Sequence, residues 1–373
     1  MTPSEARNGG PITVGLDATP LIGDRTGIGV ATAGMLRSVS SHTVITAMGY
    51  GLTSRGWRRL TAVLPPAVRM GSRWPMPAGP LLRSWKRFDW PTVERWTGPL
   101  DVVHGTNFVV PPTRRAARVV TVHDLASLHF PELCTPTARR YPDLIRRAVR
   151  TGATVHVATQ FGASEVTDAF GAPEDRVAVI PFGVDPPSLP PAKRADRAPY
   201  VLGLGTAEPR KDLPLLVAAF DALATTHPDL ELHLAGSPGW GEEALQAAVA
   251  NASHRDRIRR LGWVADTGAL IAGASVLAYP SLYEGFGFPP LEAMARGVPV
   301  VATIAGALPE VLGGAARLVA VHDRDALTGA LDDVLSRPEE AQRLSDAGLR
   351  RVAALPWSAT GDSLVELYTR LAS

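Results

Sequence analysis

Short apolar runs alternate with helical patterns along the 373 residues of the chain. A first series of runs lies at 12–17, 43–50, 101–105, 119–124, 154–159 and 177–183, and a second lies at 200–205, 230–236, 274–281, 298–303 and 317–321. Continuous apolar strands that alternate with helices indicate parallel sheets covered by helices on both faces. The pattern therefore predicts an α/β fold with two doubly wound, Rossmann-like domains.

The two series are separated by DPPSLPPAKRADRAP at 185–199, a stretch with five prolines that is typical of an exposed linker. With 45% hydrophobic residues, the chain is long enough for two sizeable cores. We expect one domain over 1–190 and a second over 191–356. An amphipathic pattern at 357–373 predicts a last helix that packs back on the first domain.

Several candidate residues directly follow predicted strands, where ligands of open parallel sheets bind. TGIG at 26–29 brings Gly27 and Gly29 before a helix, where glycine lets backbone approach a diphosphate or a sugar. A dinucleotide fingerprint is excluded because it would need a third glycine where Thr32 stands. His123 ends the run at 119–124, and its imidazole can donate to a sugar hydroxyl. His104 and His129 are interpreted as packed or peripheral residues.

The segment from Ala278 to Glu310 places two carboxylates, Glu284 and Glu292, around a glycine-rich turn. The turn is expected to expose backbone N–H groups at 286–288 before a helix over 290–296, and such an array binds anions. The carboxylates are then expected to accept hydrogen bonds from hydroxyl groups of a sugar or ribose. The alternative is that they are capping groups of a routine strand-turn-helix unit.

Arg210 and Lys211 follow the first strand of the second series and precede a helix. This position suits a diphosphate, which Arg grips in bidentate fashion and Lys attracts as a point charge. The alternative is a pair of solvated surface cations.

Composition narrows the classes of function. Lys and Arg total 38 against 36 Asp and Glu, so the net charge of +2 gives no global reason to expect nucleic acid. The single Cys134 excludes an intrachain disulfide framework and a multi-cysteine metal site. The N-terminus lacks a hydrophobic signal core, and no apolar run approaches the length of a membrane span. We therefore expect a cytoplasmic protein.

Tryptophan and arginine are interleaved over residues 55–96. The tryptophans are Trp57, Trp74, Trp85, Trp90 and Trp96, and the cations are Arg55, Arg58, Arg59, Arg69, Arg73, Arg83, Lys86 and Arg87. This combination suits weak peripheral contact with the inner face of a membrane. The alternative is that the tryptophans pack inside the domain and the arginines are solvated.

Taken together, the motifs resemble the retaining GT-B glycosyltransferases (glycosyltransferase family 4, glycosyl transferases group 1), which include bacterial mannosyltransferases of cell-envelope polysaccharide biosynthesis. The most specific parts are GTAEPRKD at 205–212, YEGFGFPPLEAMARGVPVVAT at 283–303 and LPEV at 308–311. Support comes from VHDLASLHFPE at 122–132, IPFGVD at 180–185 and TGIG at 26–29. The resemblance implies a GT-B fold, with two Rossmann-like domains facing a central cleft.

The resemblance also implies a role for each matching residue. Arg210 and Lys211 would neutralise the diphosphate of a nucleotide-sugar donor, Glu292 would bind its ribose, and His123 would contact the donor sugar. Further donor contacts would come from Gly27, Gly29, Thr206, Trp263 and Val264, and from Glu284 with Gly285, Phe286, Gly287 and Phe288. Many relatives have Arg-Tyr where this chain has Val30 and Ala31, so an arginine contact from that loop is in doubt.

The implied reaction moves a hexose with retention to a hydroxyl of a glycan, a lipid-linked or a small-molecule acceptor. GDP-mannose is the expected donor, and a UDP-sugar stays open. The family favours a front-face mechanism without a metal or another cofactor. The non-catalytic alternative is a protein that binds sugar nucleotides without turning them over.

Overall fold

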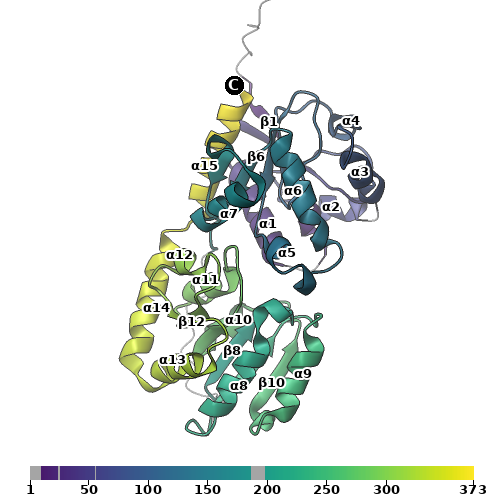
Figure 1. Cartoon of the computed structure of the whole chain (residues 1–373). Coiled ribbons are helices and arrows are strands. Elements are labelled where there is room, and N and C mark those ends of the chain that lie inside the picture. The colour runs from purple at the N-terminus through teal and green to yellow at the C-terminus, as the bar shows by residue number, and fades with distance from the viewer. Residues whose placement is uncertain (1–9, 24–25, 55, 186–197) are drawn as a thin grey trace, which may run out of the picture. The chain divides into compact units, whose positions relative to one another are not determined.

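The computed structural model describes residues 10–23, 26–54, 56–185 and 198–373 (Figure 1). Two compact units divide the chain. Unit 1 comprises residues 1–128, 136–183 and 357–373, and unit 2 comprises 129–135 and 184–356. The boundary predicted between residues 190 and 191 lies outside the described residues.

The described part of unit 1 contains a seven-stranded parallel sheet in the order β3-β2-β1-β4-β5-β6-β7. The strands are β1 (Ile12–Asp17), β2 (Ile45–Tyr50), β3 (Arg69–Met70), β4 (Val102–Gly105), β5 (Ala117–Thr121), β6 (Thr154–Val157) and β7 (Val177–Val179). The helices are α1 (Gly27–Ser40), α2 (Trp57–Val63), α3 (Ala78–Trp85), α4 (Glu94–Thr97), α5 (Ala126–His129), α6 (Tyr141–Arg150), α7 (Gln160–Phe170) and α15 (Trp357–Ala372).

The described part of unit 2 contains a six-stranded parallel sheet in the order β10-β9-β8-β11-β12-β13. The strands are β8 (Tyr200–Leu204), β9 (Glu231–Ala235), β10 (Ile258–Gly262), β11 (Val276–Tyr279), β12 (Val300–Thr303) and β13 (Arg317–Val319). The helices are α8 (Leu213–Leu223), α9 (Glu242–Asn251), α10 (Gly268–Ala272), α11 (Phe288–Met294), α12 (Leu308–Leu312), α13 (Arg324–Ser336) and α14 (Pro338–Ala353). Figure 1 shows α9 beside β10 at one edge and α13 with α14 toward the other.

The predicted α/β class with two doubly wound sheets is confirmed, because every apolar run overlaps a strand and all strand pairs are parallel. Two strands escaped the prediction. β3 has only two residues, and β10 reads IRRLG, with Arg259 and Arg260 exposed at the edge of the sheet. An edge strand with a solvated face lacks the continuous apolar run that marks a buried strand.

The last helix, α15, belongs to unit 1 and packs along α1. A Cβ atom at Gly34 of α1 would lie 2.2 Å from the indole ring of Trp357, so the helices approach closely where α1 has no side chain. Figure 1 shows α15 along one side of unit 1.

A buried chain of hydrogen bonds also ties α15 to the sheet of unit 1. Tyr368 Oη lies 2.5 Å from His104 Nδ1, and His104 Nε2 lies 2.7 Å from Thr121 Oγ1. Thr121 Oγ1 lies 2.9 Å from His156 Nδ1, and His156 Nε2 lies 2.9 Å from the Ile180 carbonyl oxygen. Because a carbonyl only accepts, each group in turn donates to the next, from Tyr368 to Ile180. Burial lowers the pKa of His156 to about 4, which keeps its ring neutral as this order requires.

Candidate functional site

The candidate site of unit 2 lies where the order of its strands reverses. The chain passes from β8 to β9 and β10 on one side of the sheet and returns to β11 on the other. The loops after β8 and β11 therefore flank the switch point, the usual place for a ligand in an open α/β sheet. Leu282 N donates to the Arg210 carbonyl at 2.8 Å, which joins the two loops.

Arg210 and Lys211 lie on a 3₁₀ turn, Pro209–Lys211, after β8. Asp212 follows with φ of 44° and leads directly into α8. The aliphatic stem of Lys211 lies against Gly205, where an added Cβ would be 3.5 Å from the lysine Cε. The turn thus sends both cationic side chains to the same side of the loop, toward the segment after β11.

Glu284 lies between these two cations. Its Oε1 is 2.6 Å from Lys211 Nζ and 3.1 Å from Arg210 Nη1. Arg210 Nη1 also donates to the Tyr283 carbonyl at 2.7 Å, and Lys211 Nζ donates to Tyr279 Oη at 2.6 Å. Glu208 also pairs with Arg210, so the cluster contains two cations and two carboxylates.

The electrostatics of the cluster follow from its burial. Burial alone would raise the pKa of Glu284, but the charges of Lys211 and Arg210 outweigh it and lower the pKa to about 2. Burial lowers the pKa of Lys211, and attraction to Glu284 partly offsets that change. Glu284 is therefore ionised at neutral pH and is a weak base.

The structure gives Glu284 a place that the sequence did not predict. The sequence assigned phosphate to the cations and hydroxyl groups to Glu284, whereas in the structure its Oε1 binds the cations directly. Tyr279 and Glu208 were missed as members of the cluster. Glu208 Oε2 lies 3.4 Å from Arg210 Nη2. Tyr279 lies in the apolar run at 274–281 as the last residue of β11, and its place next to a turn was the signal that could have identified it.

The glycine-rich turn leads directly into α11. Gly287 has φ of 100° and precedes Phe288, the first residue of the helix. The helix begins two residues earlier than predicted because both Phe288 and Pro289 adopt helical backbone, and it ends at Met294. The rings of Phe286 and Phe288 are buried and lie 5.1 Å apart. Glu292 is on this helix and is half-buried.

A second glycine, Gly306, packs against the backbone of Glu284. Gly306 has φ of 57°, and a Cβ there would lie 2.3 Å from the Glu284 carbonyl oxygen. Ala307 N donates to the same oxygen at 2.8 Å. The loop after β12 therefore holds the backbone of Glu284, which adds a third strand end to the site.

Other predicted residues of unit 2 lie in the loops after β8 and β10. Thr206 is half-buried in the loop after β8. Trp263 and Val264 follow β10, and the indole of Trp263 is 52% exposed. An exposed ring after a strand end is available to a flat ligand group.

Three predicted residues, His123, Gly27 and Gly29, lie in unit 1. His123 Nε2 donates to the Thr106 carbonyl at 2.8 Å, and burial lowers the pKa of the ring to about 4. The ring is thus neutral, and its Nδ1, which has no hydrogen-bond partner among the described residues, accepts rather than donates. In this tautomer His123 cannot donate to a sugar hydroxyl through Nδ1, as the sequence had suggested, but can accept a hydrogen bond from one.

Gly27 and Gly29 were expected in a loop before the helix. In the structure they belong to its first turn. α1 starts at Gly27, and Thr26 Oγ1 accepts a hydrogen bond from Gly29 N at 3.2 Å. Thr26 is a favourable N-cap, so the helix extends further toward β1 than the glycines suggested.

Metal ligands do not gather anywhere in the described residues, since no group of three or more His, Cys, Asp or Glu side chains could hold an ion there.

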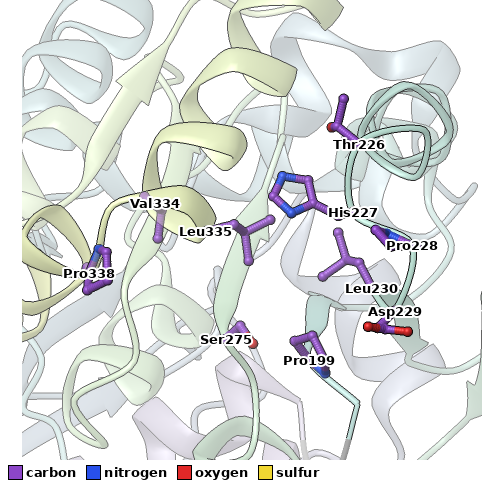
Figure 2. Close-up of a pocket in the computed structure, with 11 residues that line it drawn as sticks. Pro199, Thr226, His227, Pro228, Asp229, Leu230, Ser275, Val334, Leu335 and Pro338 are labelled. Atoms are coloured by element: carbon purple, nitrogen blue, oxygen red, sulfur yellow. The ribbon is translucent and has the colours of Figure 1, made fainter.

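A pocket of about 360 Å³ lies elsewhere in unit 2 (Figure 2). Its lining includes Pro199, Leu230 and Ser275, which immediately precede β8, β9 and β11. All strands of a parallel sheet begin on one side and end on the opposite side. This pocket lies at the amino ends of the strands, whereas Arg210 and Lys211 lie at the carboxyl ends. Figure 2 shows His227 and Leu335 among the side chains at its wall. The pocket is separate from the candidate site.

Comparison with protein families identifies two matching models. One, described as glycosyl transferases group 1, matches residues 188–351. The other, described as Glycosyltransferase Family 4, matches residues 38–188. Together they cover most of both units.

Curated relatives include two mannosyltransferases. O-antigen chain mannosyltransferase B of Escherichia coli is 30% identical over 285 residues, which cover 72% of this chain and 74% of that protein. MMP alpha-(1->4)-mannosyltransferase of Mycolicibacterium hassiacum is 34% identical over 249 residues, covering 65% of this chain and 57% of the relative. The chain thus matches between about half and three quarters of the length of these relatives.

Solved structures share the fold at low sequence identity. Sucrose-phosphate synthase from Thermosynechococcus elongatus has a TM-score of 0.75 at 20% identity, covering 96% of this chain and 99% of that one. Anabaena Alr3699/HepE in complex with UDP-glucose has a TM-score of 0.71 at 17% identity, covering 96% and 100%. At these identities the likeness concerns the fold.

Proposed function

The chain belongs to the glycosyl transferases group 1 family and is a glycosyltransferase of the GT-B fold, and from this premise we propose the reaction that it performs. It transfers a hexose, with retention of configuration, from a nucleotide diphosphate sugar to a hydroxyl group. The observation that carries this proposal is the buried cluster of Arg210, Lys211 and Glu284 at the switch point of unit 2.

The cluster supports stabilisation of a leaving diphosphate. During transfer, the bond from the anomeric carbon to the diphosphate oxygen breaks, and negative charge grows on that oxygen. Arg210 and Lys211 are already fixed by hydrogen bonds to Tyr283 and Tyr279, so little reorganisation is needed when the charge develops. We propose that Arg210 and Lys211 supply the positive charge for this step and that no metal ion is required.

Retention is proposed to follow a front-face route. The acceptor oxygen bonds to the anomeric carbon on the side that the diphosphate leaves, and its proton passes to an oxygen of the departing diphosphate. Glu284, with a pKa of about 2 and two cations on its carboxylate, is a weak base and a poor nucleophile. This favours an orienting role for Glu284 over covalent catalysis.

Mannose from GDP-mannose is the proposed donor, because both relatives described above are named as mannosyltransferases. The name of the E. coli relative supports an acceptor in the biosynthesis of cell-envelope polysaccharide, with a glycan or lipid-linked hydroxyl. Such a protein acts at the cytoplasmic face of the membrane. The second candidate is transfer from a UDP-sugar, which the HepE complex with UDP-glucose favours.

A panel of nucleotide sugars tests the donor. Thermal unfolding of the protein is measured with GDP-mannose, UDP-glucose and the ADP- and dTDP-sugars at equal concentration. A ligand that binds only the folded state raises the unfolding temperature according to its affinity, so GDP-mannose should give the largest shift. A larger shift with UDP-glucose would replace GDP-mannose by the second candidate, and no shift with any donor would contradict the proposed function.

Replacing Lys211 by Ala tests the role of the cluster. Turnover with the donor identified above should fall by about 10²- to 10³-fold, the usual effect of removing one group that stabilises developing charge. Glu284 keeps Arg210 as a partner, so the variant should fold. Arg350→Ala, an exposed position of α14, is the control and should retain full turnover. Donor binding by the wild-type protein without turnover of any acceptor or water would indicate a non-catalytic sugar-nucleotide-binding protein.

A further inference from the structure

The tryptophans of residues 55–96 divide into buried and exposed rings. Trp85 and Trp96 belong to the core of unit 1, and Trp57 Nε1 donates to Ser72 Oγ at 3.2 Å. For these three, packing within unit 1 accounts for the ring. Trp74 and Trp90, in contrast, are 45% and 71% exposed, and Phe88 beside Trp90 is 63% exposed.

The loop that carries Phe88 and Trp90 is held from inside. It follows α3, and all its residues over 86–90 are exposed. Ser84 Oγ donates to the Trp90 carbonyl at 2.5 Å, and Phe88 N donates to the Ser84 carbonyl at 2.9 Å. Trp85 Nε1 donates to the Pro91 carbonyl at 2.8 Å. The backbone is therefore anchored while two large apolar rings face solvent, an arrangement that suits contact with another surface.

The charge around these rings has one sign. The sequence contains no Asp or Glu over residues 25–88. Within its part from residue 56 to residue 88, the exposed cations are Arg58, Arg59, Arg69, Arg73, Arg83, Lys86 and Arg87. None of them forms an ion pair with another described residue. The first carboxylate after the stretch, Asp89, pairs with Arg147 of α6, so the loop itself remains positive.

We infer that this face, which we name the α3 surface, docks on an anionic lipid membrane. The α3 surface comprises Trp74, Arg83, Lys86, Arg87, Phe88 and Trp90. Indole and phenyl rings partition into the interface between lipid heads and tails, and arginine and lysine bind anionic head groups. Figure 1 shows α3 on the side of unit 1 that faces away from α15, so the helix α15 does not cover it.

Local charge favours a membrane over other occupants. The whole chain has a net charge of only +2, so the acid-free stretch makes the charge distribution of unit 1 strongly asymmetric. Such asymmetry orients a protein on a uniformly negative plane. Within the described residues, no helix is long and apolar enough to cross a bilayer, which fits contact from one side.

Vesicle flotation with the full chain tests the α3 surface. Binding is measured at low and high salt to vesicles of phosphatidylcholine alone and to vesicles that also contain phosphatidylglycerol. The protein should float with the anionic vesicles at low salt, and most of it should be released at high salt, because screening weakens attraction at the surface. No flotation with anionic vesicles at low salt, or equal flotation with neutral vesicles, would overturn the inference.

Two variants locate the contact. Lys86→Glu with Arg87→Glu should lower the fraction bound by about tenfold or more, since each cation near the surface adds to the attraction. Arg115→Glu with Arg350→Glu makes the same change in net charge at exposed positions elsewhere and should retain most of the binding. An equal loss of vesicle binding in both double variants would show a general effect of net charge. It would contradict the assignment of the α3 surface as the contact.

A third comparison separates the rings from the cations. Phe88→Ala with Trp90→Ala should weaken binding several-fold at unchanged net charge, while Trp90→Tyr should retain it, because tyrosine also favours the interface. Far-UV circular dichroism confirms that each variant is folded. Unchanged binding in the double alanine variant would contradict the role of the rings. The assay uses neither donor nor acceptor, so its outcome is independent of the proposed transfer reaction.

Discussion

Asp17 is a buried carboxyl group at the end of β1, and among the described residues only Thr19 stabilises its charge. Its Oδ1 accepts hydrogen bonds from Thr19 N at 2.9 Å and from Thr19 Oγ1 at 2.5 Å. Burial outweighs these bonds and raises the pKa of Asp17 from 3.8 to about 6. At neutral pH the folded protein therefore carries a charge that costs more to bury than its hydrogen bonds return.

Replacing Asp17 by Asn should stabilise the protein at pH 7 to 8. The folded state binds the proton of Asp17 more tightly than the unfolded state, so this group lowers stability as the pH rises from 3.8 to about 6, by about 3 kcal/mol in all. Asparagine can still accept both bonds from Thr19 but never becomes charged. Thermal unfolding at pH 5 and pH 8 should show the larger gain at pH 8. A smaller gain over wild type at pH 8 than at pH 5 would contradict this account.

That Arg210, Lys211 and Glu284 lie near one another could be predicted from the sequence, but their pairing could not. Arg210, Lys211 and Glu284 each follow a predicted strand, and parallel strands end at one edge of a sheet. Which oxygen meets which cation depends on loop conformations, such as φ of 44° at Asp212. Aspartate adopts this left-handed conformation more readily than most residues, but its presence alone does not identify the turn. The tautomer of His123 was unpredictable for a similar reason, since it depends on the carbonyl of Thr106.

At the scale of elements, the loop after β12 positions the segment after β11. Gly306 and Gly314 both have φ of 57°, but only at Gly306 would a Cβ meet other atoms, those of Glu284. Substitution at either glycine strains the backbone, but only substitution at Gly306 should also displace Glu284.

Gly306→Ala and Gly314→Ala should differ in activity. Each variant loses about 1–2 kcal/mol of stability, because alanine is strained in the left-handed region. Only Gly306→Ala should push Glu284 out of place, with a fall in kcat/KM of about 10²-fold, as small displacements in an active site commonly cause. Steady-state transfer assays with thermal unfolding as the stability control measure both effects. Equal activities in the two variants would show that the loop does not position Glu284.

Elements with a continuous apolar run were predicted well, and elements defined by neighbours were not. β8 and β11 were evident from their runs, whereas β10 forms because its backbone pairs with β9. The start of α11 was placed too late because proline suits the first turn of a helix, and the structure uses Pro289 as well as Pro290 there. α1 begins early because Thr26 caps it.

At the scale of the whole molecule, α15 returns to unit 1 after unit 2 is complete in the sequence. Tyr368 makes this return specific, because its hydroxyl begins the hydrogen-bond chain through His104. Tyr50, also fully buried in unit 1, has a hydroxyl oxygen without a hydrogen-bond partner among the described residues. The same chemical change at the two positions therefore has opposite expected effects.

Tyr368→Phe should destabilise the protein, and Tyr50→Phe should not. Loss of the Tyr368 hydroxyl leaves His104 Nδ1 buried without a donor, at a cost of about 1–3 kcal/mol. Loss of the Tyr50 hydroxyl removes an unsatisfied group and should be neutral or stabilising. Denaturant unfolding of both variants measures the difference. Equal stabilities would show that the chain of hydrogen bonds contributes nothing to holding α15.

The place of α15 in the sequence has a consequence for synthesis. All strands of unit 2 leave the ribosome before residues 357–372 do, although those residues complete unit 1. The second sheet can thus form while α1 still lacks its helical partner. Unit 1 begins first in the sequence, but we expect it to be completed after unit 2. A nascent chain paused before Trp357 would expose the groove around Gly34, and during that interval it would be open to chaperones.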